Sequence, residues 1–243
     1  MTFLEKIAAL PAAVQGYLFT DPGRNGEYHF LKRLLKYKHK PTVIDVGANI
    51  GEYARYALSI NNSAHIHCFE PVSSTFQKLS KNLINTSAIL NNVGLSDQRT
   101  EASINVYGET WGINSLYALG ERVADLAPPR LESIQLSTLD RYVAEAGLTT
   151  IDFLKIDVEG HELNVLRGAT RTLANKQIHA IQFEYNYLWK QTSNTLEGVF
   201  DLLGSDFAHY RLTPWGKWPV GRRFSASLEN YPAAANYVAL LRR

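Results

Sequence analysis

The chain has 243 residues, 45% of them hydrophobic and 20% charged, a composition typical of a soluble globular protein with a sizeable core. Its 25 basic and 23 acidic side chains leave a formal charge of +2, which is too close to neutral to predict nucleic acid or an anionic membrane as a partner. No apolar stretch approaches the roughly 20 residues that cross a bilayer, so we expect no stable membrane insertion.

The first residues and the cysteine content predict a cytoplasmic location. The opening segment 1–19 lacks a basic region ahead of an apolar one, so it indicates an amphipathic helix rather than a signal peptide. The single cysteine, Cys68, lies in the run HIHCFE and cannot form an intramolecular disulfide. We therefore expect a buried thiol in a reducing compartment.

From residue 42 onward, apolar strand segments alternate with amphipathic helix segments. Strands are predicted at 42–47, 65–70, 88–93, 152–157, 178–184, 207–212 and 236–241, and helices at 50–60, 72–85, 162–175 and 195–203. The alternation predicts an α/β fold with a mostly parallel, doubly wound, seven-stranded sheet and helices on both faces. We expect one domain over 42–243, preceded by a helical extension over 1–41.

Two segments interrupt this alternation. Residues 103–137 contain the run INVYGETWGINSLY and a proline pair, which predict an insertion with its own hairpin and an exposed loop. Residues 211–224 are rich in aromatic and basic side chains, and we expect a long loop there between the last two strands. Trp215 and Trp218 in that loop either close the edge of the core or stack on a sugar.

The run VIDVGANIGEYARYAL joins a buried strand to a helix through a turn that contains Asp45, Gly47, Asn49 and Gly51. Ligands of open α/β sheets bind at the carboxyl ends of the strands, and a glycine-rich first turn lets a ligand approach the backbone. The third glycine of the dinucleotide pattern G-x-G-x-x-G is missing. The turn therefore predicts a ligand without a pyrophosphate.

An acidic residue, Glu70, ends the second predicted strand 19 positions after Gly51, where a carboxylate can bind ribose hydroxyls. Ribose without pyrophosphate, together with Asp45 to face an ammonium group, predicts S-adenosylmethionine (SAM) as the cofactor. The alternative is that Gly47 and Gly51 only shape the turn and that Glu70 only caps the following helix.

Five segments resemble, in the same order, segments of the FkbM family of SAM-dependent methyltransferases: VIDVGANIGEYA, HCFEPVSSTFQKLSKNL, NNVGLSDQ, LSTLDRYV and IDFLKIDVEGHELNVLRGA. The resemblance extends over about residues 43–185, and LKIDVEGHE after DVGANIG is its most specific part. It implies the Rossmann-like sheet of a class I methyltransferase and, most often, O-methylation of sugar or natural-product hydroxyls. Residues before 42 and after 190 match less well, and we expect the choice of acceptor to depend on them.

The run FLKIDVEGHE places several chemical groups at the end of a central strand. Side chains alternate along a strand, so Lys155, Asp157 and Glu159 are expected on one side, and His161 opens the next helix. A neutral imidazole can accept the proton that an acceptor hydroxyl loses, so His161 is the candidate general base, oriented by Asp157 or Glu159. The alternatives are purely structural: an ion pair between Lys155 and Asp157, a helix-start role for Glu159, and a capping role for His161.

A metal site is the less favoured alternative. Asp157 with Glu184, which ends the neighbouring predicted strand, and Glu159 could hold one Mg²⁺ ion, because this ion prefers oxygen ligands. The sequence contains no tight Asp-x-Asp pair or histidine-rich cluster in support. We therefore expect SAM as the cofactor and carboxylates that act without a metal.

The class I sheet that the resemblance implies also suggests contacts elsewhere. Asp97, or Ser96 or the Leu95 backbone in its place, follows the third predicted strand and would contact the adenine. Asn114 and Ser115 of the insertion either form a lid over cofactor or acceptor, or belong to a surface hairpin that Trp111 packs onto the core.

Two other functions compete with methyl transfer. An NAD(P)-dependent oxidoreductase would need the third glycine, and the short-chain type needs a Tyr-x-x-x-Lys pair after the fourth strand; the pair Tyr28 and Lys32 precedes the first strand. A non-catalytic SAM-binding module is the second alternative. Enzymes that methylate amino groups often carry Asn/Asp-Pro-Pro-Tyr/Phe where this chain has DVEG, which favours a hydroxyl of a small molecule or glycan. The sequence leaves homo-oligomerisation open.

Overall fold

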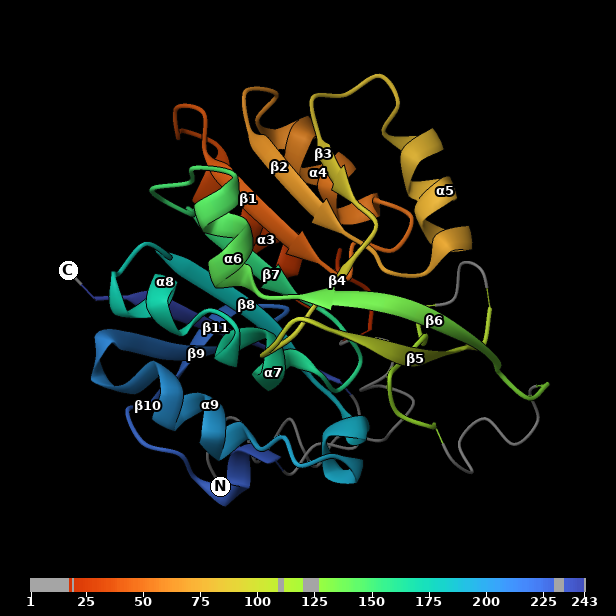
Figure 1. Cartoon of the computed structure of the whole chain (residues 1–243). Helices are drawn as coiled ribbons and strands as arrows, with labels where there is room; N and C mark the ends of the chain where they lie inside the picture. Colours follow the sequence, from red (N-terminus) through yellow and green to blue (C-terminus); the bar gives the residue numbers. More distant parts are fainter. Residues whose placement is uncertain (1–17, 19, 109–111, 120–126, 230–233, 243) are drawn as a thin grey trace.

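An eight-stranded sheet forms the centre of the fold (Figure 1). The computed structural model describes residues 18, 20–108, 112–119, 127–229 and 234–242. The first 17 residues of the predicted helical extension therefore lie outside the described residues, and so does Trp111. The described part of the extension forms helix α3 (Glu27–Leu35), which packs against the sheet.

The sheet has the mixed topology of a doubly wound fold. Its strands, in spatial order, are β10 (Gly216–Gly221), β9 (Phe207–Thr213), β11 (Ala235–Leu241), β8 (Ala180–Tyr185), β7 (Phe153–Ile156), β1 (Thr42–Val46), β2 (His65–Phe69) and β3 (Ile89–Asn91). The five strands from β8 to β3 pair in parallel, and the other three pair antiparallel. The strand order reverses between β1 and β7, which is the switch point where α/β sheets bind ligands. The predicted α/β sheet is confirmed.

The eighth strand was not expected from the sequence. Residues 216–221, predicted as loop, form β10 and pair antiparallel with β9 after a tight turn in which Thr213 donates to the carbonyl of Gly216 over 2.7 Å. The strand contains Pro219, which cannot donate to a neighbour and is tolerated because β10 is the edge of the sheet. Its side chains are largely exposed, so it lacks the apolar alternation that identifies the other strands.

Helices cover both faces of the sheet (Figure 1). The helices α3, α4 (Glu52–Ile60) and α5 (Ser73–Asn82) share one core, and α6 (Leu139–Glu145), α7 (Glu162–Arg167), α8 (Thr170–Ala174) and α9 (Leu196–Leu203) share the other. The predicted helix at 162–175 is divided into α7 and α8 at Gly168, where a Cβ atom would lie 2.0 Å from the carbonyl oxygen of Ser96. The described residues also include three short 3-10 helices: η2 (Tyr187–Gln191), η3 (Gly204–Asp206) and η4 (Ala226–Glu229).

The insertion and the residues just before it, from residue 94 onward, form a second, smaller sheet beside the carboxyl ends of β1 and β2. Its strands are β4 (Gly94–Leu95), β5 (Thr100–Val106) and β6 (Arg130–Ser137), and β5 pairs antiparallel with β6 as predicted (Figure 1). Apolar side chains of this hairpin, including Ile104 and Ile134, pack on Val72 at the start of α5. Residues 109–111 and 120–126 of the insertion lie outside the described residues.

Alternation along the central strands directs a row of polar side chains toward the α3 and α4 face. Val43, Phe153 and Ala180 pack in the core of that face, and their neighbours two residues on are Asp45, Lys155 and Gln182. These three positions lie side by side on β1, β7 and β8. All three side chains are buried.

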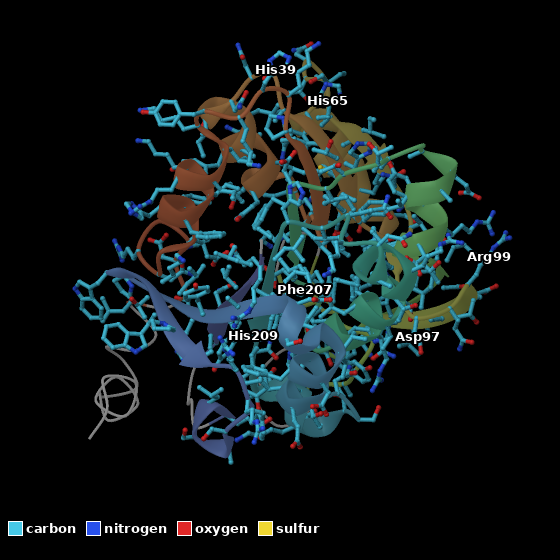
Figure 2. All side chains as sticks on the ribbon, turned by 90° about the vertical axis from the view of Figure 1, so that its left-hand side faces the viewer. His39, His65, Asp97, Arg99, Phe207 and His209 are labelled. Carbon is cyan, nitrogen blue, oxygen red and sulfur yellow. The ribbon has the colours of Figure 1, made fainter. Side chains whose placement is uncertain are left out.

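The opposite face is packed with apolar and aromatic side chains. Phe207 and His209 of β9, labelled in Figure 2, are buried, and the His209 ring stacks on Phe200 of α9 with centroids 4.2 Å apart. The expected buried thiol is also present, since Cys68 is fully buried on β2 and burial raises its pKa. None of the described helices has the length and apolarity needed to cross a membrane.

Candidate active site

The turn after β1 contacts the turn after β7. Gly47 has a φ of +78°, and a Cβ atom there would lie only 1.8 Å from the backbone oxygen of Asp157. Gly51 has a φ of +87°, and a Cβ atom there would lie 2.7 Å from Leu79 of α5. Packing against backbone therefore requires a glycine at position 47, where it lets the two turns meet at one edge of the sheet, and the left-handed backbone favours a glycine at position 51.

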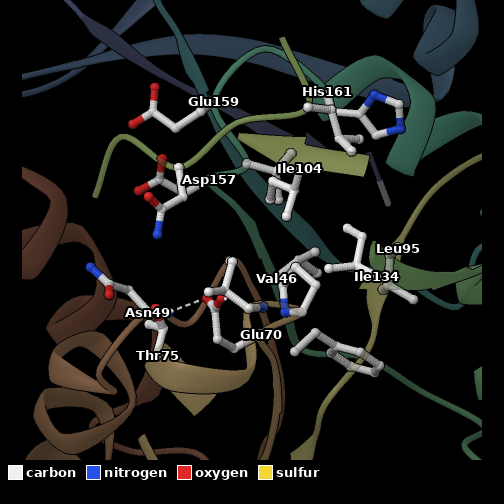
Figure 3. Close-up of a pocket in the computed structure, with 18 of the residues that line it drawn as sticks. Val46, Asn49, Glu70, Thr75, Leu95, Ile104, Ile134, Asp157, Glu159 and His161 are labelled. Atoms are coloured by element: carbon white, nitrogen blue, oxygen red, sulfur yellow. Dashed lines mark hydrogen bonds between the residues drawn. The ribbon is translucent and has the colours of Figure 1, made fainter. Parts of the chain in front are cut away.

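A pocket of about 760 Å³, open solvent at its mouth included, lies at this edge (Figure 3). We call it the apolar pocket, because its wall includes the apolar side chains of Val46, Phe69, Val72, Leu95, Ile104, Leu116, Ile134, Leu136 and Val158. Its polar side chains are Asn49, Glu70, Thr75, Asn114, Asp157, Glu159 and His161. An apolar wall with a few polar groups is the usual composition of a small-molecule site.

Glu70 is the buried acid of the apolar pocket. Its Oε2 accepts a hydrogen bond from the backbone N–H of Asn49 over 3.1 Å, shown in Figure 3, and its Oε1 accepts one from Val72 over 3.0 Å. Burial raises the pKa of Glu70 to about 7, against the lowering effect of these two donors. Each carboxylate oxygen keeps a second lone pair for a ligand hydroxyl.

A second cavity opens on the α3 and α4 side of the same turn. We call it the acidic cavity; its lining residues are Thr20, Pro22, Glu27, Tyr28, Gly47, Ala48, Asn49, Ile50, Glu52, Tyr53, Lys155, Asp157 and Glu184. Gly47, Asn49 and Asp157 line both cavities. The two cavities therefore meet at the carboxyl ends of β1 and β7, at the switch point of the sheet.

Lys155 is a buried cation held among carboxyl groups. Its Nζ donates to Asp157 over 2.9 Å and lies 4.9 Å from the centre of the Tyr53 ring. Burial alone would lower the pKa of Lys155, but the negative charges of Asp157, Asp45 and Glu27 outweigh it and hold the pKa above its usual range. The ion pair of Lys155 and Asp157, which the sequence left as an alternative, is thus present, with the Asp157 side chain 38% exposed and the Lys155 side chain 7% exposed.

Asp45 lies beneath the two cavities and lines neither of them. It is completely buried, and among the described residues neither of its carboxylate oxygens has a hydrogen-bond partner. Burial raises its pKa to about 6, while the neighbouring charge of Lys155 lowers it. Because Asp45 lines neither cavity, the structure does not bring it to a position where it would face the ammonium group of a cofactor; the nearby charge of Lys155 is what stabilises its ionised form.

Asp157, Glu159 and Glu184 each offer a carboxylate oxygen within 4.8 Å of the others. Asn186, which sequence reasoning missed, donates from its Nδ2 to Glu159 and to Glu184, both over 2.8 Å. Burial and the charge of Asp157 raise the pKa of both glutamates well above the usual value. The backbone of Glu159 has a positive φ of 55°, an unfavourable conformation for this residue type. The oxygen donors suit Mg²⁺.

His161 is held on both sides by protein hydroxyl groups. Its Nε2 lies 2.9 Å from the Ser96 hydroxyl and its Nδ1 lies 2.9 Å from the Tyr117 hydroxyl. Ser96 also donates to Asp97 over 2.9 Å, so one ordered chain satisfies every group: Tyr117 donates to Nδ1, Nε2–H donates to Ser96, and Ser96 donates to Asp97. Burial lowers the pKa of His161 to about 4, which keeps the ring neutral.

This arrangement bears on two expectations. The His161 ring points away from Asp157 in Figure 3, and it would have to give up a hydrogen bond before accepting a proton from an acceptor. Asp97 is exposed at the periphery (Figure 2), and neither it nor the buried Ser96 lines the apolar pocket, whereas Leu95 does. Of the three candidates for a contact with adenine, Asp97, Ser96 and the Leu95 backbone, only Leu95 lines the apolar pocket.

Part of the insertion lines the apolar pocket, through Gly112, Asn114 and Leu116. Asn114 lines the pocket, and its Oδ1 accepts a hydrogen bond from the N–H of Tyr107 over 2.9 Å. Ser115 is buried, and its hydroxyl donates to the backbone oxygen of Glu159 over 2.7 Å. The contact from Ser115 to Glu159 and the contact from Tyr117 to His161 attach the insertion to the turn after β7.

Sequence comparison decides between the methyltransferase and the oxidoreductase interpretations. The family described as "Methyltransferase FkbM domain" matches residues 45–212, which is well over half of the chain. The chain belongs to the FkbM methyltransferase family. It is a SAM-dependent methyltransferase, and the NAD(P)-dependent alternative is set aside. The match ends before β11 and begins after α3, so both elements lie outside the family's shared region.

Individual relatives of this FkbM-family methyltransferase are distant. It is 26% identical to the 2-O-methyltransferase NoeI of Sinorhizobium fredii over 69% of this chain and 73% of that one. It is also 26% identical to the hexuronic acid methyltransferase AglP of Haloferax volcanii over 61% of this chain and 58% of that one. A solved SAM-dependent methyltransferase from Agrobacterium tumefaciens superposes with a TM-score of 0.50 at 8% identity, covering 92% of this chain and 64% of that one, which shows the class I fold.

The residues present in this FkbM-family methyltransferase fit SAM. The apolar wall can enclose an adenine, and Glu70 has free lone pairs for ribose hydroxyls. The carboxyl groups that line the acidic cavity suit the ammonium and sulfonium charges at the other end of the molecule. The two neighbouring cavities, which share three lining residues, thus match a ligand that is a nucleoside at one end and a cation at the other.

Proposed function

We propose that this enzyme transfers the methyl group of SAM to a hydroxyl group of a sugar, glycan or natural-product acceptor. The observation that carries the proposal is the meeting of the two cavities at Gly47, Asn49 and Asp157. With the nucleoside of SAM in the apolar pocket and its ammonium end in the acidic cavity, the sulfonium group would lie at this junction, beside Asp157. The name of the relative NoeI, a 2-O-methyltransferase, supports an oxygen acceptor.

The protein residues would contribute binding, orientation and proton removal. SAM, when bound, supplies a methyl group on a positively charged sulfur. Glu70 would bind the ribose, and the fixed turns at Gly47 and Asp157 would align the acceptor oxygen, a positioning effect of up to several kcal/mol. The acceptor hydroxyl must lose its proton as its oxygen becomes methylated.

Asp157 is the group that we assign to accept this proton. Its side chain is partly exposed at the junction of the two cavities, and the ion pair with Lys155 fixes one of its oxygens. Glu159 and Glu184 each offer an oxygen within 4.8 Å of Asp157. Burial raises the pKa of both glutamates and so favours their protonated, neutral forms, which lets them share the proton with Asp157. We assign His161 a positioning role instead, because both of its ring nitrogens are hydrogen bonded to side chains.

A metal-assisted version of the same reaction is the second candidate. The oxygens of Asp157, Glu159 and Glu184 could hold one Mg²⁺ ion, which would polarise the acceptor hydroxyl. The ordered contacts of Asn186 to both glutamates favour a preformed donor set. We keep the metal-free version as the main proposal, because Lys155 already neutralises Asp157.

Two measurements test the proposal. Calorimetry should show S-adenosylhomocysteine (SAH) binding with a Kd in the micromolar range or tighter, about −8 kcal/mol. Mass spectrometry should then detect a methyl group gained at oxygen when the enzyme and SAM are incubated with nucleotide sugars, oligosaccharides and hydroxylated natural products. SAH binding without transfer to any acceptor class would instead support a non-catalytic SAM-binding module.

A further inference from the structure

The turn between β9 and β10 lies at the same edge of the sheet as the candidate active site. β8 runs parallel to β7, and β11 pairs antiparallel with both β8 and β9, so β9 ends at the edge where β7 and β8 end. Three strand spacings separate β9 from β7, a distance of about 14 Å. A molecule that extends from Asp157 along this edge by more than one sugar ring therefore approaches the turn.

Backbone contacts fix this turn to the wall of the cofactor site. The Thr213 hydroxyl donates to the carbonyl oxygen of Gly216 over 2.7 Å and closes the turn. On the other side, a Cβ atom on Gly26 would lie only 2.3 Å from the backbone oxygen of Thr213. The residue after Gly26 is Glu27, which is buried and lines the acidic cavity. The turn thus has a defined position relative to the bound cofactor.

Two tryptophans of this hairpin are exposed. Trp215 in the turn is 67% exposed and Trp218 of β10 is 43% exposed, whereas Trp189 is buried. Neither Trp215 nor Trp218 belongs to a hydrophobic core of the described residues, so closing the edge of the core does not account for them. Large apolar side chains that stay in contact with water beside a site are typical of a surface that binds a ligand.

A protein strand is a poor partner for this hairpin. A strand that adds to the edge of a sheet needs a regular row of backbone N–H and C=O groups. Pro219 has no N–H, and the pairing of β10 with β9 shifts register between Pro219 and Gly221. Both features protect an edge strand against the addition of another strand.

An anionic lipid surface also matches the hairpin poorly, because it would need several cations around the tryptophans. Lys217 is the only basic residue in the segment 213–220. Arg222 and Arg223 follow the end of β10, roughly 17 Å along the strand from the turn. The positive charges are thus spread along the hairpin and do not gather around Trp215.

A sugar chain matches the groups that the turn presents. One face of a pyranose ring consists largely of C–H groups, and hydroxyl groups surround its edge. An exposed indole offers a flat apolar face with an N–H donor at its rim. Lys217, whose Nζ lies 3.7 Å from the centre of the Tyr210 ring, adds donors for hydroxyl oxygens two positions after Trp215.

We propose that the β9–β10 hairpin is a second acceptor subsite, in which Trp215 stacks on a sugar ring of an oligosaccharide several units away from the hydroxyl group that is methylated. This inference rests on the proposed function and narrows its acceptor class to a sugar chain. The FkbM family match ends at residue 212, immediately before the turn. The subsite therefore lies beyond the shared methyltransferase domain, where the choice of acceptor can differ between relatives.

The test applies the SAH-loaded full chain to immobilised glycans of one to six sugar units, and then measures the Kd of each bound glycan by calorimetry. The longest chains should bind at least about tenfold more tightly than the monosaccharide of the same terminal unit, which corresponds to about 1.4 kcal/mol. W215A should remove most of this advantage, W215F should retain it, and both should bind SAH normally. With a long acceptor, W215A should raise KM about tenfold and leave kcat unchanged.

Y37A is the matched control for the loss of an exposed aromatic ring. Tyr37 is 87% exposed and lies at the opposite edge of the sheet, next to Lys38, which pairs with Asp152 just before β7. Y37A should leave the Kd of every glycan unchanged. Because Trp215 is exposed and W215F should retain the affinity, misfolding cannot imitate the supporting result.

The outcomes separate this inference from the proposed function. Failure of SAH to bind would overturn the proposed function itself. Normal SAH binding without binding of any glycan, with equal affinity for short and long glycans, or with equal effects of W215A and Y37A would overturn only the subsite. Vesicles of phosphatidylcholine and phosphatidylglycerol test the lipid alternative: vesicle binding that W215A abolishes, without dependence on glycan length, would assign the hairpin to a membrane surface and overturn the subsite as well.

Discussion

The backbone oxygen of Asp157 lies where a side chain of residue 47 would have to be. A Cβ atom on Gly47 would lie 1.8 Å from that oxygen, and the same glycine has a left-handed φ of +78°. The turn that binds the cofactor and the turn that carries the proposed proton acceptor thus fix each other's position. This contact links SAM binding to the placement of Asp157.

The first prediction follows from this contact. Gly47→Ala should lower the free energy of unfolding by roughly 2–4 kcal/mol and weaken SAH binding at least tenfold, because the turns after β1 and β7 must separate. Gly147→Ala is the matched control, since Gly147 also has a positive φ, +63°, but has open space around its Cβ position. It should cost only about 1 kcal/mol and leave SAH binding unchanged. Equal effects of the two variants in calorimetry and thermal unfolding would contradict the link.

The second prediction concerns the pH dependence of cofactor binding. Burial raises the pKa of Glu70 to about 7, and only the ionised carboxylate accepts two ribose hydroxyls fully. SAH affinity should therefore rise by about tenfold between pH 6 and pH 8, as the carboxyl group loses its proton. In Glu70→Gln the affinity at pH 8 should be lower by roughly 1–3 kcal/mol, and the rise with pH should disappear. A rise of the same size in the variant would assign the titration to another group.

Parts of the fold were predictable because they depend on local patterns. The central strands and the helices α4, α5 and α9 follow apolar periodicity, and the rule that ligands bind at strand carboxyl ends found Glu70 and Asp157. The helix α6 was not predicted, although Thr138 caps it by accepting from the N–H of Arg141 over 3.2 Å. Seven residues are few for a periodic signal, and β10 with Pro219 has none.

The site was less predictable where it depends on contacts between distant segments. The near-neutral pKa of an ordinary imidazole and the position of His161 in the sequence make it a reasonable base. The Tyr117 hydroxyl that binds its Nδ1 is, however, 44 residues away along the chain. Glu27 contacts Asn236, 209 residues along the chain, so no local motif connects either residue with the acidic cavity. Asn186 had a signal in the sequence, since it follows Glu184 by two positions at the end of β8.

The third prediction separates a positioning role of His161 from a catalytic one. His161→Gln and Tyr117→Phe should each lower the free energy of unfolding by about 1–2 kcal/mol, because each breaks a mostly buried hydrogen bond. They should lower kcat by less than about tenfold, whereas removal of a general base costs roughly 10²–10⁴-fold. A loss in the larger range for His161→Gln, with normal SAH binding and normal kcat in Tyr117→Phe, would restore His161 as the base.

The same ring has a signature in the pH dependence of stability. Burial lowers the pKa of His161 from 6.5 to about 4, so the folded state favours the neutral ring. Its contribution to stability is complete above pH 6.5 and is lost as the pH falls toward 4, where the unfolded chain binds the proton first. Denaturant unfolding at pH 7.5 and pH 5 should therefore show a smaller loss of stability in His161→Gln than in the native chain. An unchanged difference would mean that the ring is charged in the folded protein.

The fourth prediction concerns the metal. If Asp157 acts with Lys155 and without Mg²⁺, methyl transfer should proceed at an undiminished rate in excess EDTA. A divalent ion held by Asp157, Glu159 and Glu184 would give the opposite result: activity lost in EDTA and restored by Mg²⁺. Addition of Mg²⁺ to the SAH-loaded chain, followed by calorimetry, reports binding to the same carboxylates without reliance on turnover. Micromolar binding that Glu184→Gln abolishes would move the proposal to the metal-assisted version.

The last prediction tests Asp157 as the proton acceptor. Asp157→Asn keeps the shape of the side chain but removes its basic oxygen, so kcat should fall by roughly 10²–10⁴-fold while SAH binding changes by no more than a few-fold. Some loss of stability is also expected, because Lys155 loses its partner at 2.9 Å and remains buried.

Asp152→Asn is the matched control. Asp152 lies just before β7, at the opposite end of the strand, and pairs with Lys38 over 2.6 Å. The variant therefore loses an ion pair of the same kind far from both cavities. Both variants should be less stable than the native chain, but only Asp157→Asn should lose methyl transfer, and Asp157→Glu should recover part of it. Two results would contradict this role of Asp157: an equal loss of activity in Asp152→Asn, or a near-native kcat in Asp157→Asn. The proton would then pass to Glu159 or Glu184, and Glu184→Gln should show the loss expected of the base.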